Sequence, residues 1–292
     1  MNKAAYFTLS TLAIGAALFT ACDEDTVPLR PLPDDGGGAL DGTATGEAGG
    51  GHPGKAQQTG RVVDLGAQGT GVGGATINIG GQTITADAKG NYSVLYPLNT
   101  PVSMVVTAPK YFKLLEAEWL LKQDASRGPT RLPSVDSASS LLAALSLAGP
   151  VDKSLGVISV WAIPMPGCAS EGGATFTVSP TTASTLGVYL KSTLPDVNLS
   201  SAVAGENPHI VFYNLPLGKV TVTVNHPTCS QLPYPQTDTD GFTYTGNVTV
   251  EALSANTLSF LRVFLGPHVD VDAGTDASFD SSFDSSFDAN DQ

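Results

Sequence analysis

Short runs of alternating apolar and polar residues, broken by Gly, Pro and Asn, constrain this chain more than any other feature of its 292 residues. Residues 75–79 (ATINI) and 82–86 (QTITA) alternate with a period of two, and a Gly-Gly pair separates them. The stretch 87–91 (DAKGN) is typical of a tight turn with Gly90 at positive φ, and residues 92–96 (YSVLY) follow it. A period of two places alternate side chains on opposite faces of a strand, so the pattern predicts a β-sandwich of short strands.

A second group of β runs fills the C-terminal half of the chain. Strands are expected there at 155–163, 174–178, 186–190, 210–214, 219–225, 242–250 and 257–265. The fold class is therefore predicted to be mainly β, with two Ig-like β-sandwich modules joined by a short helix and flanked by disordered ends.

The joining helix is expected at 136–147. Asp136 or Ser137 can cap it, Leu and Ala fill its interior, and Gly149 with the following Pro stops it. The segment 112–122 (FKLLEAEWLLK) is ambiguous, because its composition favours a helix while its position suits a last edge strand.

The first group of runs resembles the carboxypeptidase regulatory-like domains, whose fold is a transthyretin-like sandwich. Their motifs G-x-V, G-A-x-V, T-D-x-x-G-x-Y and A-x-G-Y are matched by residues 60–62 (GRV), 74–77 (GATI), 86–92 (ADAKGNY) and 108–111 (APKY). The departures are Ala86 for Thr, Asn99 where a turn Gly would lie, and Lys110 for Gly. The second group looks like a diverged relative, through residues 173–176 (GATF) and 212–218 (FYNLPLG). These motifs are turn and packing requirements, so the resemblance implies a fold and no reaction.

The N-terminus is typical of an export and anchoring signal. Lys3 precedes an uncharged apolar run at 4–20, and Ala21 and Cys22 follow. Residues 18–22 (LFTAC) resemble a bacterial lipobox, in which cleavage before the Cys is followed by lipid attachment to it. The resemblance implies lipidation of Cys22 and a place in the cell envelope, on the inner or outer membrane and facing the periplasm or the cell surface. The alternative is an ordinary cleaved signal peptide with an incidental Cys22.

Two acidic, low-complexity stretches flank the β regions. Both hold too few apolar residues to form a core, and the second repeats the unit SFDS or SFDA after residue 277, with no basic residue beyond Arg262. The predicted division of the chain is a signal peptide (1–21), a lipidated Cys and disordered tether (22–58), a first sandwich (59–123), a helical connector (124–153), a second sandwich (154–266) and an acidic tail (267–292).

The chain has three cysteines, and the lipobox accounts for one of them. Cys168 and Cys229 remain for a single disulfide in an oxidising compartment. The alternatives are two free buried thiols, or a zinc site, for which the usual Cys and His spacings are missing.

We predict no catalytic, cofactor or metal site. Residues 69–74 (GTGVGG) fit the letters of a dinucleotide-binding loop, but a β run follows them where that site needs a helix. None of the four histidines lies in a zinc-peptidase motif, and no nucleophile elbow is present; the histidines are His52, His209, His226 and His268.

Two weaker signals concern calcium and sugars. The acidic turns at 238–241 and 270–276 offer alternating carboxylates but lack the further ligands of a calcium loop, so solvated turns are expected. Five aromatic residues could form a sugar-stacking platform, as in carbohydrate-binding relatives of this sandwich class, but core positions are expected for most of them: Trp161, Tyr189, Tyr213, Tyr234 and Tyr244.

The sequence thus predicts a non-enzymatic envelope protein, attached to a membrane through lipid and binding a glycan or another surface protein through sandwich faces and loops. The net charge of −13, without a Lys/Arg cluster, excludes nucleic acid as a partner. The rival hypothesis is an accessory or catalytic component of a carbohydrate- or peptide-processing system.

Overall fold

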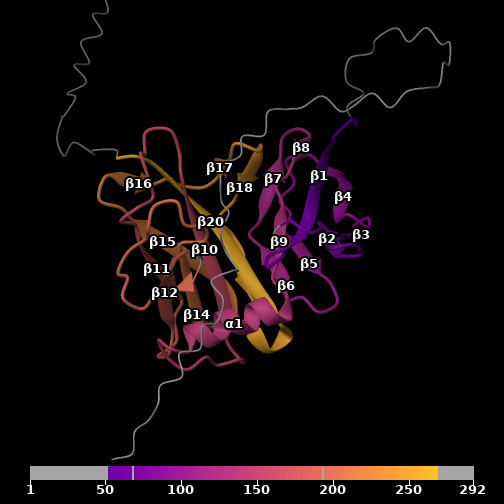
Figure 1. Ribbon diagram of the computed structural model, residues 1–292. Helices are drawn as coiled ribbons and strands as arrows, with labels where there is room; N and C mark the ends of the chain where they lie inside the picture. Colours follow the sequence, from indigo (N-terminus) through magenta and orange to yellow (C-terminus); the bar gives the residue numbers. More distant parts are fainter. Residues whose placement is uncertain (1–51, 68, 193, 269–292) are drawn as a thin grey trace, which may run out of the picture.

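Figure 1 shows the computed structural model of the chain, which describes residues 52–67, 69–192 and 194–268. The predicted signal peptide, Cys22 and nearly all of the predicted tether and tail lie outside the described residues. Strands dominate the described part, whose single α-helix is α1 (Val135–Leu145), so the prediction of a mainly β fold is confirmed. None of its helices is long and apolar enough to cross a membrane.

The first sandwich packs two layers of strands around an apolar core. One layer pairs β1 antiparallel with β4 and parallel with two short strands; these are β1 (Lys55–Asp64), β4 (Asn91–Pro97), β8 (Ala125–Ser126) and β9 (Thr130–Leu132). The opposite layer contains β2 (Thr76–Ile79), β3 (Gln82–Thr85), β5 (Met104–Thr107) and β6 (Lys113–Glu116). As the alternation predicts, Ile77 and Ile79 point into the core while Asn78 between them is exposed.

The second sandwich is built in the same way. Its larger layer holds β10 (Gly156–Pro164), β12 (Leu186–Lys191), β13 (Leu194–Pro195), β14 (Ile210–Leu215), β16 (Cys229–Gln231) and β20 (Thr257–Pro267). Three strands form the facing layer: β11 (Thr175–Ser179), β15 (Gly218–Asn225) and β19 (Val248–Val250).

One continuous sheet joins the two sandwiches. Strand β20 lies parallel to β10 on one side and parallel to β6 on the other, which produces the order β13-β12-β14-β10-β20-β6-β5-β2-β3. A second join is made by β18 (Phe242–Tyr244), which pairs with β7 (Trp119–Leu121) of the N-terminal half and with β17 (Gln236–Thr237). The sandwiches therefore share hydrogen-bonded strands as well as side-chain contacts (Figure 1).

The ambiguous segment 112–122 forms two strands and no helix, and the second of them, β7, ends the strand order β17-β18-β7. Its first strand, β6, is an interior strand between β5 and β20. Leu114, Leu115 and Glu116 are buried on both of its faces, which explains why the segment lacks clean alternation.

Two other boundaries differ from those expected. Strand β1 begins at Lys55, ahead of the expected start at 59, because Ala56 and Gln58 are buried. The expected connector 124–153 also carries β8 and β9, which pair with β1.

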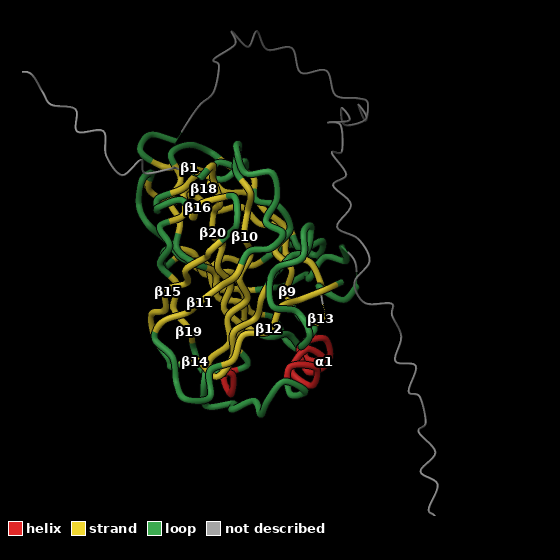
Figure 2. The backbone as a smooth tube through the Cα atoms, turned by 90° about the vertical axis from the view of Figure 1, so that its left-hand side faces the viewer, coloured by secondary structure: helices red, strands yellow, loops and turns green. Residues whose placement is uncertain are grey.

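Helix α1 is capped by Ser134, and by neither Asp136 nor Ser137 as expected. The Ser134 hydroxyl accepts a hydrogen bond from the Ser137 backbone N–H at 3.2 Å. The buried face of the helix packs with Val188, Leu190 and the 3₁₀ turn at Leu253–Ala255. Figures 1 and 2 place α1 at one end of the molecule and the starts of the grey flanking segments, after Pro267 and before Lys55, at the other.

Two turn residues other than Gly adopt a left-handed backbone conformation. Asn99 and Lys110 have φ values of 54° and 67°, the left-handed region for which Gly is normally used. Gly90 has φ of 84°, as its turn predicts.

Candidate functional site

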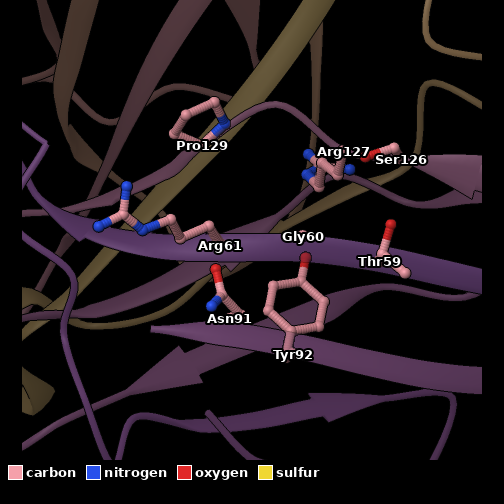
Figure 3. A pocket seen from close by; sticks show the side chains of 8 residues that line it. All are labelled: Thr59, Gly60, Arg61, Asn91, Tyr92, Ser126, Arg127 and Pro129. Atoms are coloured by element: carbon pink, nitrogen blue, oxygen red, sulfur yellow. The ribbon is translucent and has the colours of Figure 1, made fainter. Parts of the chain in front are cut away.

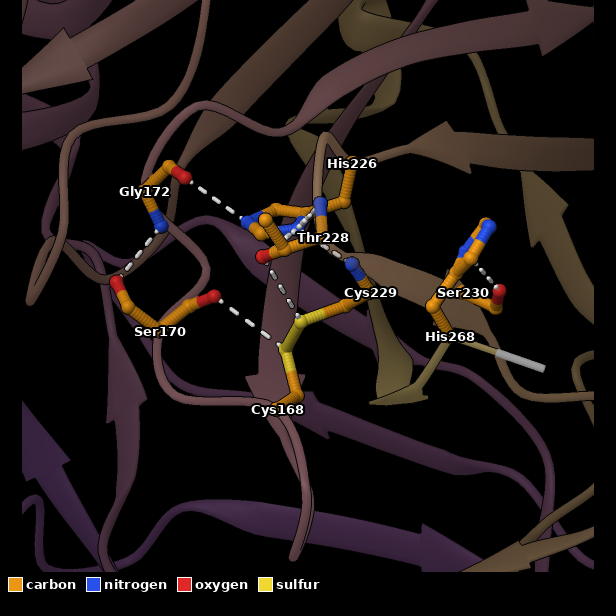
Figure 4. Close-up of a disulfide and its surroundings, with 8 residues drawn as sticks. All are labelled: Cys168, Ser170, Gly172, His226, Thr228, Cys229, Ser230 and His268. Atoms are coloured by element: carbon orange, nitrogen blue, oxygen red, sulfur yellow. Dashed lines mark hydrogen bonds between the residues drawn. A yellow bond between two sulfur atoms is a disulfide. The ribbon is translucent and has the colours of Figure 1, made fainter. Parts of the chain in front are cut away.

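The predicted disulfide is present between Cys168 and Cys229, whose Cα atoms are 5.6 Å apart. Cys168 lies in the loop after β10, and Cys229 begins β16 (Figure 4). Because β16 pairs with the last residues of β20, the bond ties this loop to the place where the described chain ends.

His226 lies beside this disulfide and holds the turn that leads to it. Its Nδ1 accepts hydrogen bonds from the backbone N–H groups of Cys229 at 3.0 Å and Thr228 at 3.2 Å. Nε2 therefore carries the proton and donates to the Gly172 carbonyl at 2.9 Å (Figure 4). Nδ1 or Nε2 of His226 lies within 4.8 Å of both sulfurs, but the sulfurs are bonded to each other and cannot act as zinc-binding thiolates.

His209 is fully buried in the second sandwich. Its Nδ1 accepts a hydrogen bond from the Ala162 backbone N–H at 3.1 Å, and its Nε2 lies 3.2 Å from Glu171 Oε1. Burial lowers the pKa of His209 below its usual range, and the nearby Glu171 carboxylate offsets only part of this effect. The His209 ring is therefore neutral at pH 7 and closed to solvent, which suits a core position.

Of the two remaining histidines, His52 is exposed at the start of the described chain. His268 Nδ1 lies 3.1 Å from the Ser230 hydroxyl beside the disulfide.

In the acidic turn at 238–241, the carboxylate oxygens of Asp238 accept hydrogen bonds from other groups of the fold. Asp238 Oδ1 accepts hydrogen bonds from the backbone N–H groups of Asp240 and Phe242, and its Oδ2 accepts one from Arg262 at 2.8 Å. The ion pair with Arg262 supplies the positive charge that a calcium ion would bring. The second acidic turn, at 270–276, lies outside the described residues.

The five aromatic residues considered for a sugar platform are mostly core residues. Tyr213, Tyr244 and Tyr189 are buried, and Tyr234 is half-buried with its hydroxyl donating to the Arg262 carbonyl. Trp161 is half-buried as well, because it contacts Phe260 and the Arg262 guanidinium covers its ring.

Sequence reasoning missed the polar groups where the two sandwiches meet. Arg127 forms a buried ion pair with Glu116, and its guanidinium lies 4.5 Å from the Trp119 ring centroid and 5.0 Å from that of Phe242. Burial alone would lower the pKa of Arg127, but the Glu116 carboxylate more than offsets this and raises it.

Arg262 repeats the arrangement closer to the surface. It pairs with Asp238 and lies 5.3 Å from the Tyr244 ring centroid and 5.0 Å from that of Trp161. We call the contacts of these two arginines the seam. No local pattern marks the seam in the sequence, because Arg127 stands in the polar stretch DASRGPTR.

One hollow in the described surface, of about 400 Å³, lies between β1 and residues 126–129. Figure 3 shows Arg61 lying along β1 and the Tyr92 hydroxyl pointing toward Gly60. Arg61 Nε donates to the Lys89 carbonyl, and the described lining of the hollow contains no pair of nucleophile and base. A smaller hollow of about 100 Å³ is bordered by Glu118, whose carboxylate accepts hydrogen bonds from Thr245 and Asn247.

The glycine-rich loop 69–74 leads into β2 and packs against the backbone at Lys89. A Cβ added to Gly71 would lie 1.9 Å from the Lys89 carbonyl oxygen, so the glycine allows a close approach of two chain segments. Strand β2 follows the loop at the position where a nucleotide site has a helix N-terminus.

No protein-family model matches the chain, and no curated protein matches it either. Among solved structures, it is similar to the Bacillus anthracis TIE protein at 13% identity and a TM-score of 0.24, covering 73% of this chain and 34% of that one. It is also similar to the minor pilin of Streptococcus agalactiae at 10% identity and a TM-score of 0.22, covering 75% of this chain and 99% of that one. The major pilin subunit of Bacillus cereus has 10% identity and a TM-score of 0.21, covering 68% and 56%.

The chain thus spans about a third of the length of the TIE protein. TM-scores this low carry no argument about function, and the fold assignment rests on the sheets described above.

Proposed function

We propose that this chain is a lipid-anchored protein of the cell envelope, whose two transthyretin-like sandwiches act as a non-catalytic binding and spacing module. The proposal rests on one observation, which is that the candidate catalytic and metal-binding side chains of this chain form hydrogen bonds within the fold. His209, His226 and Asp238 each bind backbone N–H groups of the fold, and none of them forms a pair of nucleophile and base in an open pocket of the described residues.

The positions of the chain ends support the spacing role. Strand β1 begins, and β20 ends, at the end of the molecule that lies opposite α1 (Figure 1). A tether that joins Cys22 to Lys55 would therefore hold the fold by that end, and the α1 end would point away from the membrane. The partner we propose is a glycan or another surface protein, bound through loops and sheet faces.

Replacing Cys22 tests the anchor. The lipobox-like segment leads us to expect that Cys22→Ser moves the protein from the membrane fraction to the soluble fraction, because the acyl chains supply most of the membrane affinity. Cys168→Ser is the matched control, and it should stay in the membrane fraction. If Cys22→Ser stays bound through detergent-free washing, the lipid anchor is wrong.

Binding and activity assays on the full chain separate the proposal from its rival. A glycan array and a pull-down should find a ligand, while peptide, ester and glycoside substrates should remain uncleaved. Hydrolysis that disappears in His226→Ala or His209→Gln, with the fold intact, would favour the catalytic hypothesis.

A further inference from the structure

A break in the pairing of strand β1 leaves a hollow in the surface of the first sandwich. Strand β1 pairs with β8 as far as Thr59, and with β9 from Val62 onward. Gly60 and Arg61 lie between these two pairings, beside the connecting residues 127–129. The hollow of about 400 Å³ occupies this interval, and its volume is within the range of small-molecule binding sites.

Arg61 is a fixed positive charge at this hollow. Its side chain is half-buried, and its Nε donates a hydrogen bond to the Lys89 carbonyl at 2.9 Å, which holds it along β1 (Figure 3). Among the described residues, Arg61 forms no ion pair, and the described lining of the hollow contains no Asp or Glu. In a chain with 27 acidic residues against 14 basic ones, a fixed arginine without a carboxylate partner favours the binding of an anion.

Uncharged hydrogen-bonding groups line the rest of the hollow. Figure 3 shows Ser126 on one side of β1 and Asn91 on the other, with Thr59 on the strand itself. The hydroxyls of Thr59 and Ser126 form no hydrogen bond with other described residues. Asn91 Nδ2 donates to Asp87 at 3.0 Å, which orients the amide and leaves its oxygen as an acceptor. Hydroxyls and an amide in this arrangement can donate to and accept from the hydroxyls of a sugar ring.

Two further lining residues also favour a polar ligand. Arg127 lines the hollow, and its buried Nη1 has no hydrogen-bond partner among the described residues, although Nη2 pairs with Glu116. A buried donor of this kind costs free energy unless a ligand or a water molecule meets it. Pro129 is the one exposed apolar residue of the described lining, so an apolar side chain of a peptide would have little to pack on.

We propose that this hollow binds an acidic sugar residue of a glycan. The terminal nitrogens of Arg61 donate to the sugar carboxylate, and Thr59, Ser126 and Asn91 exchange hydrogen bonds with the ring hydroxyls. The net charge of −13 repels a polyanion, so the acidic residue is an isolated one in an otherwise neutral glycan. This inference rests on the proposed binding function and names the class of ligand that one site takes.

Calorimetric titration of the full chain with three probes tests the class of ligand. The probes are a trisaccharide that contains one uronic acid, the same trisaccharide with its carboxylate reduced to an alcohol, and an acetylated tripeptide that ends in a free carboxylate. The acidic trisaccharide should bind about tenfold more tightly than either of the others, because it alone offers both a carboxylate and ring hydroxyls. Equal affinity for the acidic and the reduced trisaccharide would overturn the proposal. Tighter binding of the peptide would also overturn it, in favour of a peptide site.

Substitutions at Arg61 test the position of the site. Arg61→Gln should weaken binding of the acidic trisaccharide about tenfold, and Arg61→Lys should weaken it less, because lysine keeps the charge but cannot donate two parallel hydrogen bonds. Lys122→Gln is the matched control, since it removes an exposed positive charge of the same sandwich outside the hollow, and it should bind like the parent. Thermal unfolding checks that each variant keeps its fold.

The glycan array separates failure of this site from failure of the proposed function. A glycan that the parent and Arg61→Gln bind equally well would leave the binding function standing and would show that the acidic-sugar site is wrong. A chain that binds no glycan and no surface protein would contradict both.

Discussion

The two sandwiches stabilise their cores in different ways. In the first, a chain of hydrogen bonds crosses the core: Trp119 Nε1 donates to Tyr96, and the Tyr96 hydroxyl donates to the Gln58 side chain. The second core is a nearly continuous cluster of aliphatic side chains, and the disulfide lies at its margin. The first core thus adds a chain of side-chain hydrogen bonds to its apolar packing, whereas the second adds a covalent bond and the buried contact of His209 with Glu171.

The cores also differ in which parts of the chain they use. Phe242, Tyr244 and Phe264, all from the C-terminal half, complete the core of the first sandwich. The second core takes only Ala117 from the N-terminal half. A third cluster packs Phe112 and the α1 residues Ala138 and Leu145 on the second sandwich, so each sandwich draws on the other, and the first does so through three aromatic rings of its core.

Separating the halves should have the largest effect. A fragment of residues 52–153 lacks the three C-terminal aromatic rings and leaves β6 without β20, so we expect no cooperative unfolding transition. The matched fragment 154–268 keeps the cluster around the disulfide but loses α1 and β6, so it should retain a transition at a lower temperature than that of the full chain. Circular dichroism during heating measures both fragments. A cooperative transition in the first fragment would show that the first sandwich folds without the C-terminal half.

Removing Arg127 should have the next largest effect. Arg127→Ala leaves the Glu116 carboxylate buried without its partner, so the free energy of unfolding should fall by about 3–5 kcal/mol. Arg262→Ala should cost less, about 1.5–3 kcal/mol, because Asp238 keeps its backbone hydrogen bonds. Urea unfolding compares the two variants, and Arg127→Met/Glu116→Leu should recover most of the loss. Equal losses for Arg127→Ala and Arg262→Ala would show that burial at the seam is unimportant.

Breaking the disulfide should affect the second sandwich alone. Cys168→Ala/Cys229→Ala removes a crosslink between residues 61 apart in sequence, and we expect a loss of about 2–4 kcal/mol in the free energy of unfolding. Hydrogen exchange should increase in β16 and in the loop after β10, and stay unchanged in β2 and β5. Increased exchange that spreads equally to β2 would show that the disulfide supports both sandwiches.

The smallest effect concerns pH. His209 has a lowered pKa in the folded chain, so its neutral form is favoured by folding and its contribution is fully present above the unfolded pKa of about 6.5. Stability should therefore fall as the pH drops below that value, by up to about 1.4 kcal/mol per pH unit for one proton. His209→Gln should flatten this dependence between pH 6.5 and 5, while His226→Gln serves as the control. Unfolding curves that keep the same slope in His209→Gln would exclude His209 as its source.

Local sequence patterns predicted the strands and turns whose conformation depends on neighbouring residues in the chain. Alternation located β2 and β3, and turn composition placed Gly90 at positive φ. The structure adds a reason for Gly60, because a Cβ at that position would lie 2.5 Å from the Tyr92 hydroxyl oxygen. Elimination among three cysteines was enough for the disulfide.

Features that depend on distant partners had no local signal. The pairing of β20 with β6 joins residues 257–260 to 113–116, and nothing in either run specifies a parallel neighbour. Arg127 stands in a polar stretch (DASRGPTR) that resembles a surface loop. Its burial depends on Glu116 and on the Phe242 ring, which only the complete fold brings together.

Strand β20 is the last strand of the described chain, yet it occupies the middle of the continuous sheet. During synthesis, which runs from the N-terminus, the sheet cannot close until residues 257–267 are available. Pairing between segments so far apart in sequence is slow, which delays the final structure further. A polypeptide with this order of assembly stays open while it is being made, and that is the state in which it can be threaded across a membrane before it folds.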